Sequence, residues 1–444
     1  MWLESDPYKR LWVRAAVFLV CGYMLYNRNF AYIGIPAAKI FIGDALLALF
    51  FIFGMGTMIG PWLTGLIRQT PLSGFSWGLL LFLMYGLFQF ARGLALGHSP
   101  VLALEELVFN VYPLFFFVGL EAALRYRGLL PKLFKFAAII SCFGSVMYLV
   151  AREVGTVPSF ISWLEPSAGP FVILGGLTYF DLRRWWPVIV LHVFTTLMSQ
   201  VRAVWAGLAV AFVVDAIVTR RLKRFAWATA SVVALLLMGA LIDFRIPSPE
   251  GRGGEVSSRE LLARAIAPFD PESALELSRK NAGMYAGTVQ WRRRWWLEIW
   301  RSSQEDLETS LLGHGYGFPL HELVPYLRTA EDLRTPHNIF FFALGYTGWV
   351  GAVLFYSLQA SLGLILLRVA RSTGQTFGIV FWTWMLTGSH FGNGFETPFG
   401  AIPYYLLVGM AAAELVGNSA AEESVIDMSS MEPASQGEML THGP

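Results

Sequence analysis

Residues 334–355 read RTPHNIFFFALGYTGWVGAVLF, a short polar sequence followed directly by an apolar run. The run continues to about residue 367, which is long enough to cross a hydrocarbon layer of about 30 Å as a helix. His337 and Asn338 therefore stand where a polar segment meets a predicted transmembrane helix. A buried structural histidine is the simplest interpretation of His337 taken alone, so its role depends on the rest of the chain.

The composition indicates a protein that spans a lipid bilayer several times. Of its 444 residues, 55% are hydrophobic and 14% are charged, whereas a soluble domain has roughly 25% charged residues. A net charge of +2 and the lack of a long basic run argue against nucleic acid as a partner. Both cysteines, Cys21 and Cys142, lie inside apolar runs, so neither a disulfide framework nor a cysteine metal site is expected.

Apolar runs of transmembrane length predict the secondary structure of most of the chain. Residues 167–200 form a further apolar stretch, but Asp181, Arg183, Arg184 and Pro187 break it, so we predict two short spans there. The prediction is an all-α polytopic membrane protein with about twelve transmembrane helices. The ten clear runs are residues 11–27, 37–58, 75–92, 101–120, 132–150, 203–219, 225–243, 338–367, 375–391 and 399–416.

Basic residues predict the orientation, because lysine and arginine concentrate in short cytoplasmic loops. With the N-terminus inside, all predicted inner loops contain basic residues: YKRLWVR, the loop with Arg68, RYRGLLPK, DLRR, TRRLKR and RVARS. The alternate connections carry few: NRNFAYIGIP, GHSP, REVGTVPSFISWLEPSAG and FGNGFETP. We therefore expect both termini to be cytoplasmic and one large loop to lie outside.

This topology divides the chain into four parts. Residues 1–243 form a bundle of about nine helices, and residues 244–336 form the large external loop. Residues 337–416 return to the membrane, and residues 417–444 are an acidic, serine-rich tail that we expect to be disordered. Within the loop, SSRELLARAIA, PESALELSRKNAG and TVQWRRRWWLEIWRSSQEDLE have helix-compatible patterns, the last suited to the membrane interface.

Polar side chains inside predicted spans are costly and are therefore candidates for function. Of these, Arg92, Glu105, Glu106 and Arg202 fall near the external helix ends, on the side of His337. Arg202 can reach toward the interface or can offer a fixed, forked cation to a lipid diphosphate, and its position permits both. The full set is Asp44, Arg92, Glu105, Glu106, His192, Arg202, Asp215 and His390.

The external loop adds the sequence LLGHGYGF, in which Gly313, Gly315 and Gly317 alternate. Such glycines can bring backbone amides close to an anion, although most short Gly-x-Gly-x-Gly stretches are ordinary turns. The chain contains no Asp-x-Asp, P-loop or His-Glu-x-x-His sequence. The remaining chemistry at the outer face consists of arginines, carboxylates and His337, and no metal or cofactor is expected.

Taken in order, these elements resemble the O-antigen ligase and Wzy-type polymerase superfamily of bacterial membrane glycosyltransferases. Arg202 begins a mid-chain span, and Arg293 and Leu297 have an Arg-x-x-x-Leu spacing near the end of the loop. The alternating glycines follow, and then Pro-His-Asn precedes the helix with GYTGWVG. The loop residues that carry the resemblance are Arg292, Arg293, Arg294, Trp296 and Leu297.

The resemblance implies a GT-C-like enzyme of the bacterial inner membrane that needs no metal and inverts the anomeric centre. It would transfer a glycan from undecaprenyl diphosphate to an acceptor hydroxyl, on lipid A-core or another glycan, at the periplasmic face. His337 would be the catalytic residue, and Arg202, Arg292, Arg293 and Arg294 would bind the diphosphate. Supporting roles would fall to Asn338 as a helix cap, and to Gly313, Gly315, Gly317, Arg92 and Glu105.

Two activities fit this resemblance: a ligase that delivers a finished glycan to its acceptor, and a polymerase that joins lipid-linked repeats. We favour the ligase because the single large loop lies late in the chain and one His motif is present. A polysaccharide-related transporter is the alternative from another class, since transporters also carry charges within spans. Transporters often contain two similar halves, and the chain shows no such repeat.

Overall fold

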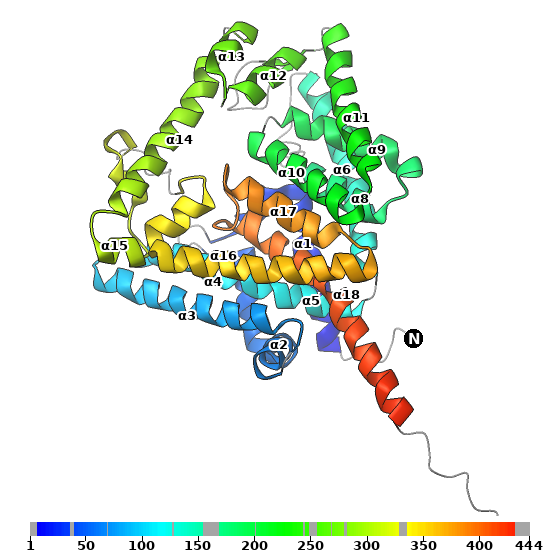
Figure 1. The fold of residues 1–444 in the computed structure, drawn as a ribbon, viewed down its shortest axis with the longest axis vertical. Helices are drawn as coiled ribbons and strands as arrows, with labels where there is room; N and C mark the ends of the chain where they lie inside the picture. The colour runs from blue at the N-terminus through cyan, green and yellow to red at the C-terminus, as the bar shows by residue number, and fades with distance from the viewer. Residues whose placement is uncertain are drawn as a thin grey trace, which may run out of the picture.

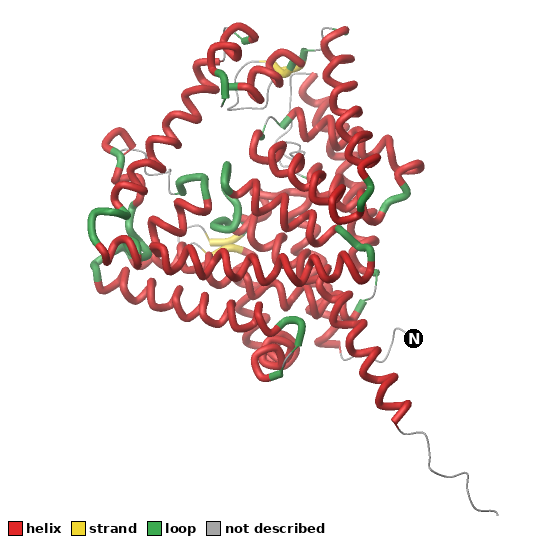
Figure 2. Tube along the Cα trace, viewed as in Figure 1, coloured by secondary structure: helices red, strands yellow, loops and turns green. Residues whose placement is uncertain are grey.

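The computed structural model describes residues 7–35, 40–68, 70–126, 128–153, 168–199, 201–242, 245–247, 255–267, 269–278, 282–327 and 335–430. Over these residues the chain is helical, with 17 α-helices and two small antiparallel hairpins of two-residue strands (Figure 2). The hairpins are β1 (Gly34–Ile35) with β2 (Ile40–Phe41), and β3 (Ile246–Pro247) with β4 (Glu255–Val256). The all-α prediction is therefore confirmed.

The first part of the chain forms helices where the apolar runs predicted them. The stretch 167–200 is indeed two helices, and the break falls at Phe180 and Asp181, where Asp181 caps α9 by accepting a hydrogen bond from the Arg183 N–H group. The helices are α1 (Pro7–Ala31), α2 (Ile42–Ile67), α3 (Ser73–Ala95), α4 (Pro100–Val111), α5 (Phe115–Arg125), α6 (Leu129–Glu153), α8 (Gly169–Tyr179), α9 (Leu182–Met198), α10 (Arg202–Thr219) and α11 (Leu222–Leu241).

The large loop contains α12 (Ser258–Ile266), α13 (Pro271–Leu277), α14 (Ala282–Ser302) and α15 (Leu307–Leu312). The three helical segments predicted there are confirmed. Ser257, Asp270 and Asp306 cap α12, α13 and α15 by accepting hydrogen bonds from the first helical turn. Short 3-10 turns at Leu320–Leu323 and Pro325–Leu327 follow α15.

Three helices complete the chain: α16 (Ile339–Thr373), α17 (Phe377–Ser389) and α18 (Pro398–Ser430). Helix α18 continues past residue 417, where we expected a disordered tail to begin. The sequence here includes Ala420, Ala421, Glu422 and Glu423, and alanine and glutamate are strong helix formers. Residues 431–444 of the expected tail lie outside the described residues.

Six helical segments are long and apolar enough to cross a membrane, judged by length and composition over the described residues. They are Ser73–Ala95, Pro100–Arg125, Leu129–Met147, Arg202–Thr219, Ile339–Thr373 and Pro398–Val416. Each coincides with a span predicted from the sequence. The other predicted spans are helical as well, and several are short, such as α8 and α17. The protein is a membrane protein, and the total of twelve spans stays a prediction.

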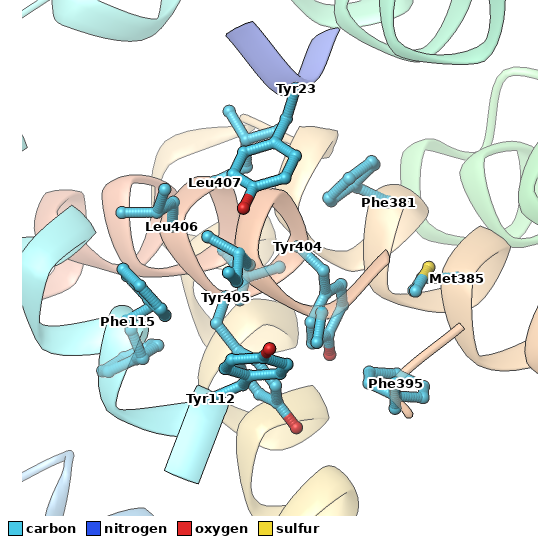
Figure 3. Packing of buried hydrophobic residues seen from close by; sticks show 14 of the residues in the cluster. Tyr23, Tyr112, Phe115, Phe381, Met385, Phe395, Tyr404, Tyr405, Leu406 and Leu407 are labelled. Carbon is cyan, nitrogen blue, oxygen red and sulfur yellow. The ribbon is translucent and has the colours of Figure 1, made fainter. Parts of the chain in front are cut away.

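Helix α3 packs against α4 and α16, and α12 and α13 lie at the opposite end of the molecule from α3, joined to this side by the long helix α14 (Figure 1). The core lies around the first turns of α18, where Tyr404 and Tyr405 are surrounded by other aromatic rings (Figure 3). Phe395, in the α17–α18 loop, is fully buried and meets Tyr404 edge-on, with ring centroids 4.8 Å apart. This contact fixes the loop of residues 390–397 against the bundle.

Candidate active site

The glycine segment of residues 313–317 docks on α16 through backbone hydrogen bonds. The N–H groups of His314 and Gly315 donate to the carbonyl oxygens of Gly345 and Tyr346, at 2.9 and 3.0 Å. These carbonyls are available because α16 is kinked at Gly348, whose φ of 62° interrupts the regular helix. A side chain on Gly348 would collide with the Leu311 carbonyl, so the Gly-x-Gly-x-Gly and GYTGWVG sequences together form one junction.

The amides of this segment are already engaged by protein acceptors. Gly313 donates to the Thr309 carbonyl at 2.9 Å, and Gly317 donates to Glu106 Oε2 at 2.5 Å. All three glycines have positive φ, between 68° and 85°, a conformation that strongly favours glycine. These contacts therefore favour the interpretation of the Gly-x-Gly-x-Gly motif as a turn over its interpretation as an anion-binding site.

Arg92 of α3 and Glu106 of α4 hold the same junction from the other side. Arg92 Nη1 donates to the Gly313 carbonyl at 2.9 Å, and Arg92 Nη2 pairs with Glu308 at the same distance. Glu106 receives the Gly317 amide, and Glu105 precedes it in α4, partly exposed. The structure thus places Arg92 and Glu106 at the glycine junction, where their contacts secure the loop.

His337 has an uncommon backbone conformation, with a φ of 54° in the left-handed region. Such a residue costs about 1 kcal/mol or more and often marks a functional position. Its ring meets the Trp291 ring edge-on, with centroids 5.8 Å apart, and the Asn393 side chain acts on the ring as a hydrogen-bonding group that raises its pKa. Burial lowers the pKa of His337 to about 4, aided by the positive charge of Arg292 and Arg28 and opposed by the Asn393 contact.

The structure separates the three consecutive arginines of α14. Arg292 is partly buried, lies over the Trp291 ring at 5.3 Å from the ring centroid, and donates from Nη1 to the Phe391 carbonyl at 3.1 Å. Arg293 and Arg294 are exposed. Of these three arginines, Arg292 is the one whose charge lowers the pKa of His337.

The tryptophans of α14 attach this helix to the rest of the protein. Trp295 is fully buried and donates its indole N–H to the Leu320 carbonyl at 2.9 Å. Trp296 donates to the Pro336 carbonyl at 2.7 Å and stacks on Phe341 with the rings 9° from parallel. These contacts hold α14 against the segment that carries His337, and the membrane-interface position expected for this helix stays a prediction.

Asn338 caps α16, as predicted. Its Oδ1 accepts hydrogen bonds from the N–H groups of Phe340 and Phe341, at 2.9 and 3.3 Å. Its Nδ2 also donates to the His390 carbonyl at 2.8 Å, a contact with the α17–α18 loop. The His390 ring is itself fixed, since Tyr356 Oη lies 2.7 Å from Nε2 and the Leu386 carbonyl lies 2.7 Å from Nδ1.

Arg202 begins α10, as the sequence predicted, and reaches the same loop through its neighbour Ala203. A methyl group placed on Gly392 would lie 3.3 Å from Ala203 Cβ, so the start of α10 is in close contact with the loop. Gly392 stands between Phe391, which accepts from Arg292, and Asn393, which contacts His337. Residues 391–393 therefore contact Ala203, the neighbour of Arg202, accept a hydrogen bond from Arg292 and act on His337, although these positions are far apart in the sequence.

Sequence reasoning missed three residues of this cluster: Arg28, Asn393 and Glu396. Arg28 lies near the end of α1, with its guanidinium 5.6 Å from the Tyr32 ring centroid, and its charge acts on His337. In the sequence, Arg28 was noticeable only as a basic residue in a connection predicted to lie outside the membrane. Glu396 is buried; Oε2 accepts from the Gly394 N–H at 3.0 Å, and burial raises its pKa to about 7. Asn393 lies between two glycines, a pattern that predicts a turn and does not indicate a functional residue.

The fold and this cluster define a helical membrane protein that gathers arginines and a histidine beside one loop. Residues 187–356 match the family model for O-antigen ligase, Wzy_C, whose members are membrane enzymes that transfer glycans. This match confirms the resemblance seen in the sequence. It includes Arg202, the α14 arginines and His337, but not Arg28, Arg92 or Asn393. No curated protein is similar enough to be matched to the chain.

Proposed function

We propose that this protein transfers a glycan from undecaprenyl diphosphate to an acceptor hydroxyl at the periplasmic face of the bacterial inner membrane. The observation that carries the proposal is that residues 391–393 contact the start of α10 beside Arg202, accept a hydrogen bond from Arg292 and act on His337, within a chain whose residues 187–356 match O-antigen ligase. The donor would be a lipid-linked glycan, and the acceptor would be lipid A-core or another glycan. Nucleic acid has no part in this function.

The proposal includes a topology in which these residues face the periplasm. About twelve spans, with both termini in the cytoplasm, would place residues 244–336 outside as the large loop. Residues 1–243 and 337–416 would form the two transmembrane parts. Arg202, His337 and residues 390–397 then fall at external ends of helices, where a lipid-linked donor can present its diphosphate.

Charge on the leaving diphosphate would dominate the chemistry. The bond between the sugar C1 and the diphosphate oxygen breaks, the electron pair stays on the diphosphate, and the acceptor oxygen bonds to C1 from the opposite face, with inversion. Arg292 and Arg202 would stabilise the growing negative charge, and Arg28 adds a third positive group near His337. Because guanidinium groups supply this stabilisation, we propose that the reaction needs no metal.

His337 would receive the acceptor's proton or orient its hydroxyl. With a pKa of about 4, its ring is neutral at physiological pH and has a nitrogen lone pair available. An imidazolium at this position would repel the neighbouring arginines, which is consistent with the ring entering the reaction neutral. Asn338 supports the site by capping α16 and by holding the His390 carbonyl.

The test uses the purified full-length protein in nanodiscs with a synthetic undecaprenyl-diphosphate oligosaccharide. Two acceptors are compared, lipid A-core and a second lipid-linked repeat. Transfer to lipid A-core supports the favoured ligase activity, and a ladder of longer lipid-linked chains identifies the polymerase. If the glycan is transferred to neither acceptor, the proposed function is refuted. Full activity after treatment with EDTA is expected, and its loss would refute metal independence.

Two histidine variants separate chemistry from folding. His337→Ala should lower the transfer rate by roughly 10²–10⁴ while donor binding persists. His321→Ala is the matched control, since His321 lies in the same loop within the Leu320–Leu323 turn. Normal turnover per folded molecule in His337→Ala would remove the residue from the active site.

A further inference from the structure

The α17–α18 loop presents one amide side chain to the histidine, that of Asn393. Gly392 and Gly394 flank it, and both pack closely: Gly392 meets Ala203, and a side chain on Gly394 would collide with Ser389. Phe395, fully buried, follows directly. The loop is therefore held on both sides of Asn393, and this residue has a fixed position relative to α10 and the core.

Asn393 is associated with Thr335 and His337, two of the polar residues that precede α16. The Thr335 hydroxyl donates to Asn393 Oδ1 at 2.8 Å, which holds this amide two residues from His337, and the amide raises the pKa of the His337 ring as a hydrogen-bonding group. Asn338 adds a parallel link by donating to the His390 carbonyl at 2.8 Å. Residues 335–338 and residues 390–393 are thus joined by a row of side-chain hydrogen bonds, with Asn393 as the member that reaches the histidine.

We propose that Asn393 is the positioning residue for His337, holding the imidazole in one tautomer with its free nitrogen available to the acceptor hydroxyl. This inference rests on the proposed transfer function. A neutral imidazole has one N–H and one lone pair, so an amide oxygen that accepts the N–H leaves the other nitrogen unprotonated. In catalytic dyads generally, the base is oriented by a third group in this way.

An amide suits this position better than a carboxylate would. Positive groups act on His337 from two other elements, Arg292 from α14 and Arg28 from α1, and the Trp291 ring covers one edge. A carboxylate at residue 393 would attract these arginines away from the donor and would stabilise the imidazolium. On its own loop, Glu396 is turned toward the Gly394 N–H. The neutral amide orients His337 without adding charge.

The experiment compares Asn393→Ala, Asn393→Asp and Thr335→Val in the full-length protein. Transfer is measured with the undecaprenyl-diphosphate donor, and the His337 tautomer is measured by carbon-13 NMR of histidine-labelled protein, assigned by the signal missing in His337→Ala. Asn393→Ala should lower kcat about 10- to 100-fold with an unchanged donor KM, because misplacing a reacting group by about 1 Å can cost this much. Thr335→Val should give a smaller loss in the same direction.

The Asn393→Asp variant tests the positioning role through the pH–rate profile, which would not change if Asn393 were only structural. The added carboxylate should raise the acidic limb of the pH–rate profile by one pH unit or more. Gln375→Ala, which removes an amide at the other end of α16, is the control and should behave as wild type. An unchanged tautomer in Asn393→Ala, or an unchanged acidic limb in Asn393→Asp, would overturn the inference. If the wild type lacks transfer activity but Asn393→Ala alters the tautomer, the proposed function fails and the positioning contact stands.

Discussion

Substitution of the α14 arginines by lysine tests which of them meets the diphosphate. Arg292 is held between the Trp291 ring and the Phe391 carbonyl, whereas Arg293 and Arg294 are exposed on the same helix. Lysine keeps the charge but loses the planar fork that binds a diphosphate with two hydrogen bonds. Loss of one preorganised donor to a developing anion costs about 2.7–4 kcal/mol, so we expect Arg292→Lys to lower kcat by roughly 10²–10³.

The two neighbouring arginines are matched controls for this substitution. Arg293→Lys and Arg294→Lys change the same chemical group one and two residues away, and exposed substitutions usually alter stability by less than about 0.5 kcal/mol. Their transfer rates should stay within about twofold of the wild type, measured on purified protein at saturating acceptor. A normal rate in Arg292→Lys, or a large loss in either control, would refute the assignment of Arg292 to the diphosphate.

Three further predictions follow from charges near His337. Arg28→Gln should raise the donor KM about tenfold, because a charge-assisted hydrogen bond contributes about 1.5–3 kcal/mol; an unchanged KM would place Arg28 outside the site. The acidic limb of kcat/KM should lie near pH 4, the pKa of His337, and a limb near 6.5 would contradict this. Burial raises the pKa of Glu396 from 4.5 to about 7, so its contribution to stability is present below pH 4.5 and is lost as the pH rises to 7. Glu396→Gln should therefore stabilise the protein by up to roughly 3 kcal/mol at pH 8 and very little at pH 4.5, measured by thermal unfolding.

The helices were predictable because their signal is local. A run of apolar residues of sufficient length indicates a helix in a bilayer wherever it occurs, and the break at Asp181 was visible as a charge within such a run. The Asn338 cap was also local, since it depends on the next three residues. Where the chain departed from expectation, as in α18 beyond residue 417, two local signals competed: an acidic, polar composition and good helix formers.

The arrangement of the candidate site could be predicted only in part. The sequence proposed His337, Arg202 and the α14 trio, but it could not show that, within the trio, Arg292 donates to the Phe391 carbonyl and acts on the pKa of His337. It left open whether the glycines approach an anion or form a turn, and it could not show that this segment docks on α16. These outcomes depend on contacts between segments hundreds of residues apart, such as Arg92 with Gly313, and no local pattern records such contacts.

The low pKa of His337 has opposite consequences before and after the donor binds. In the free protein, burial and the charges of Arg292 and Arg28 disfavour protonation, so His337 is a weak base. A bound diphosphate would bring negative charge to the same arginines, and an opposite charge within about 4–6 Å typically favours a protonated form by 1–3 pKa units. The histidine would then gain basicity only in the donor complex, when a proton acceptor is needed. The arginines would thus suppress protonation of His337 in the free enzyme and bind the diphosphate whose charge removes that suppression.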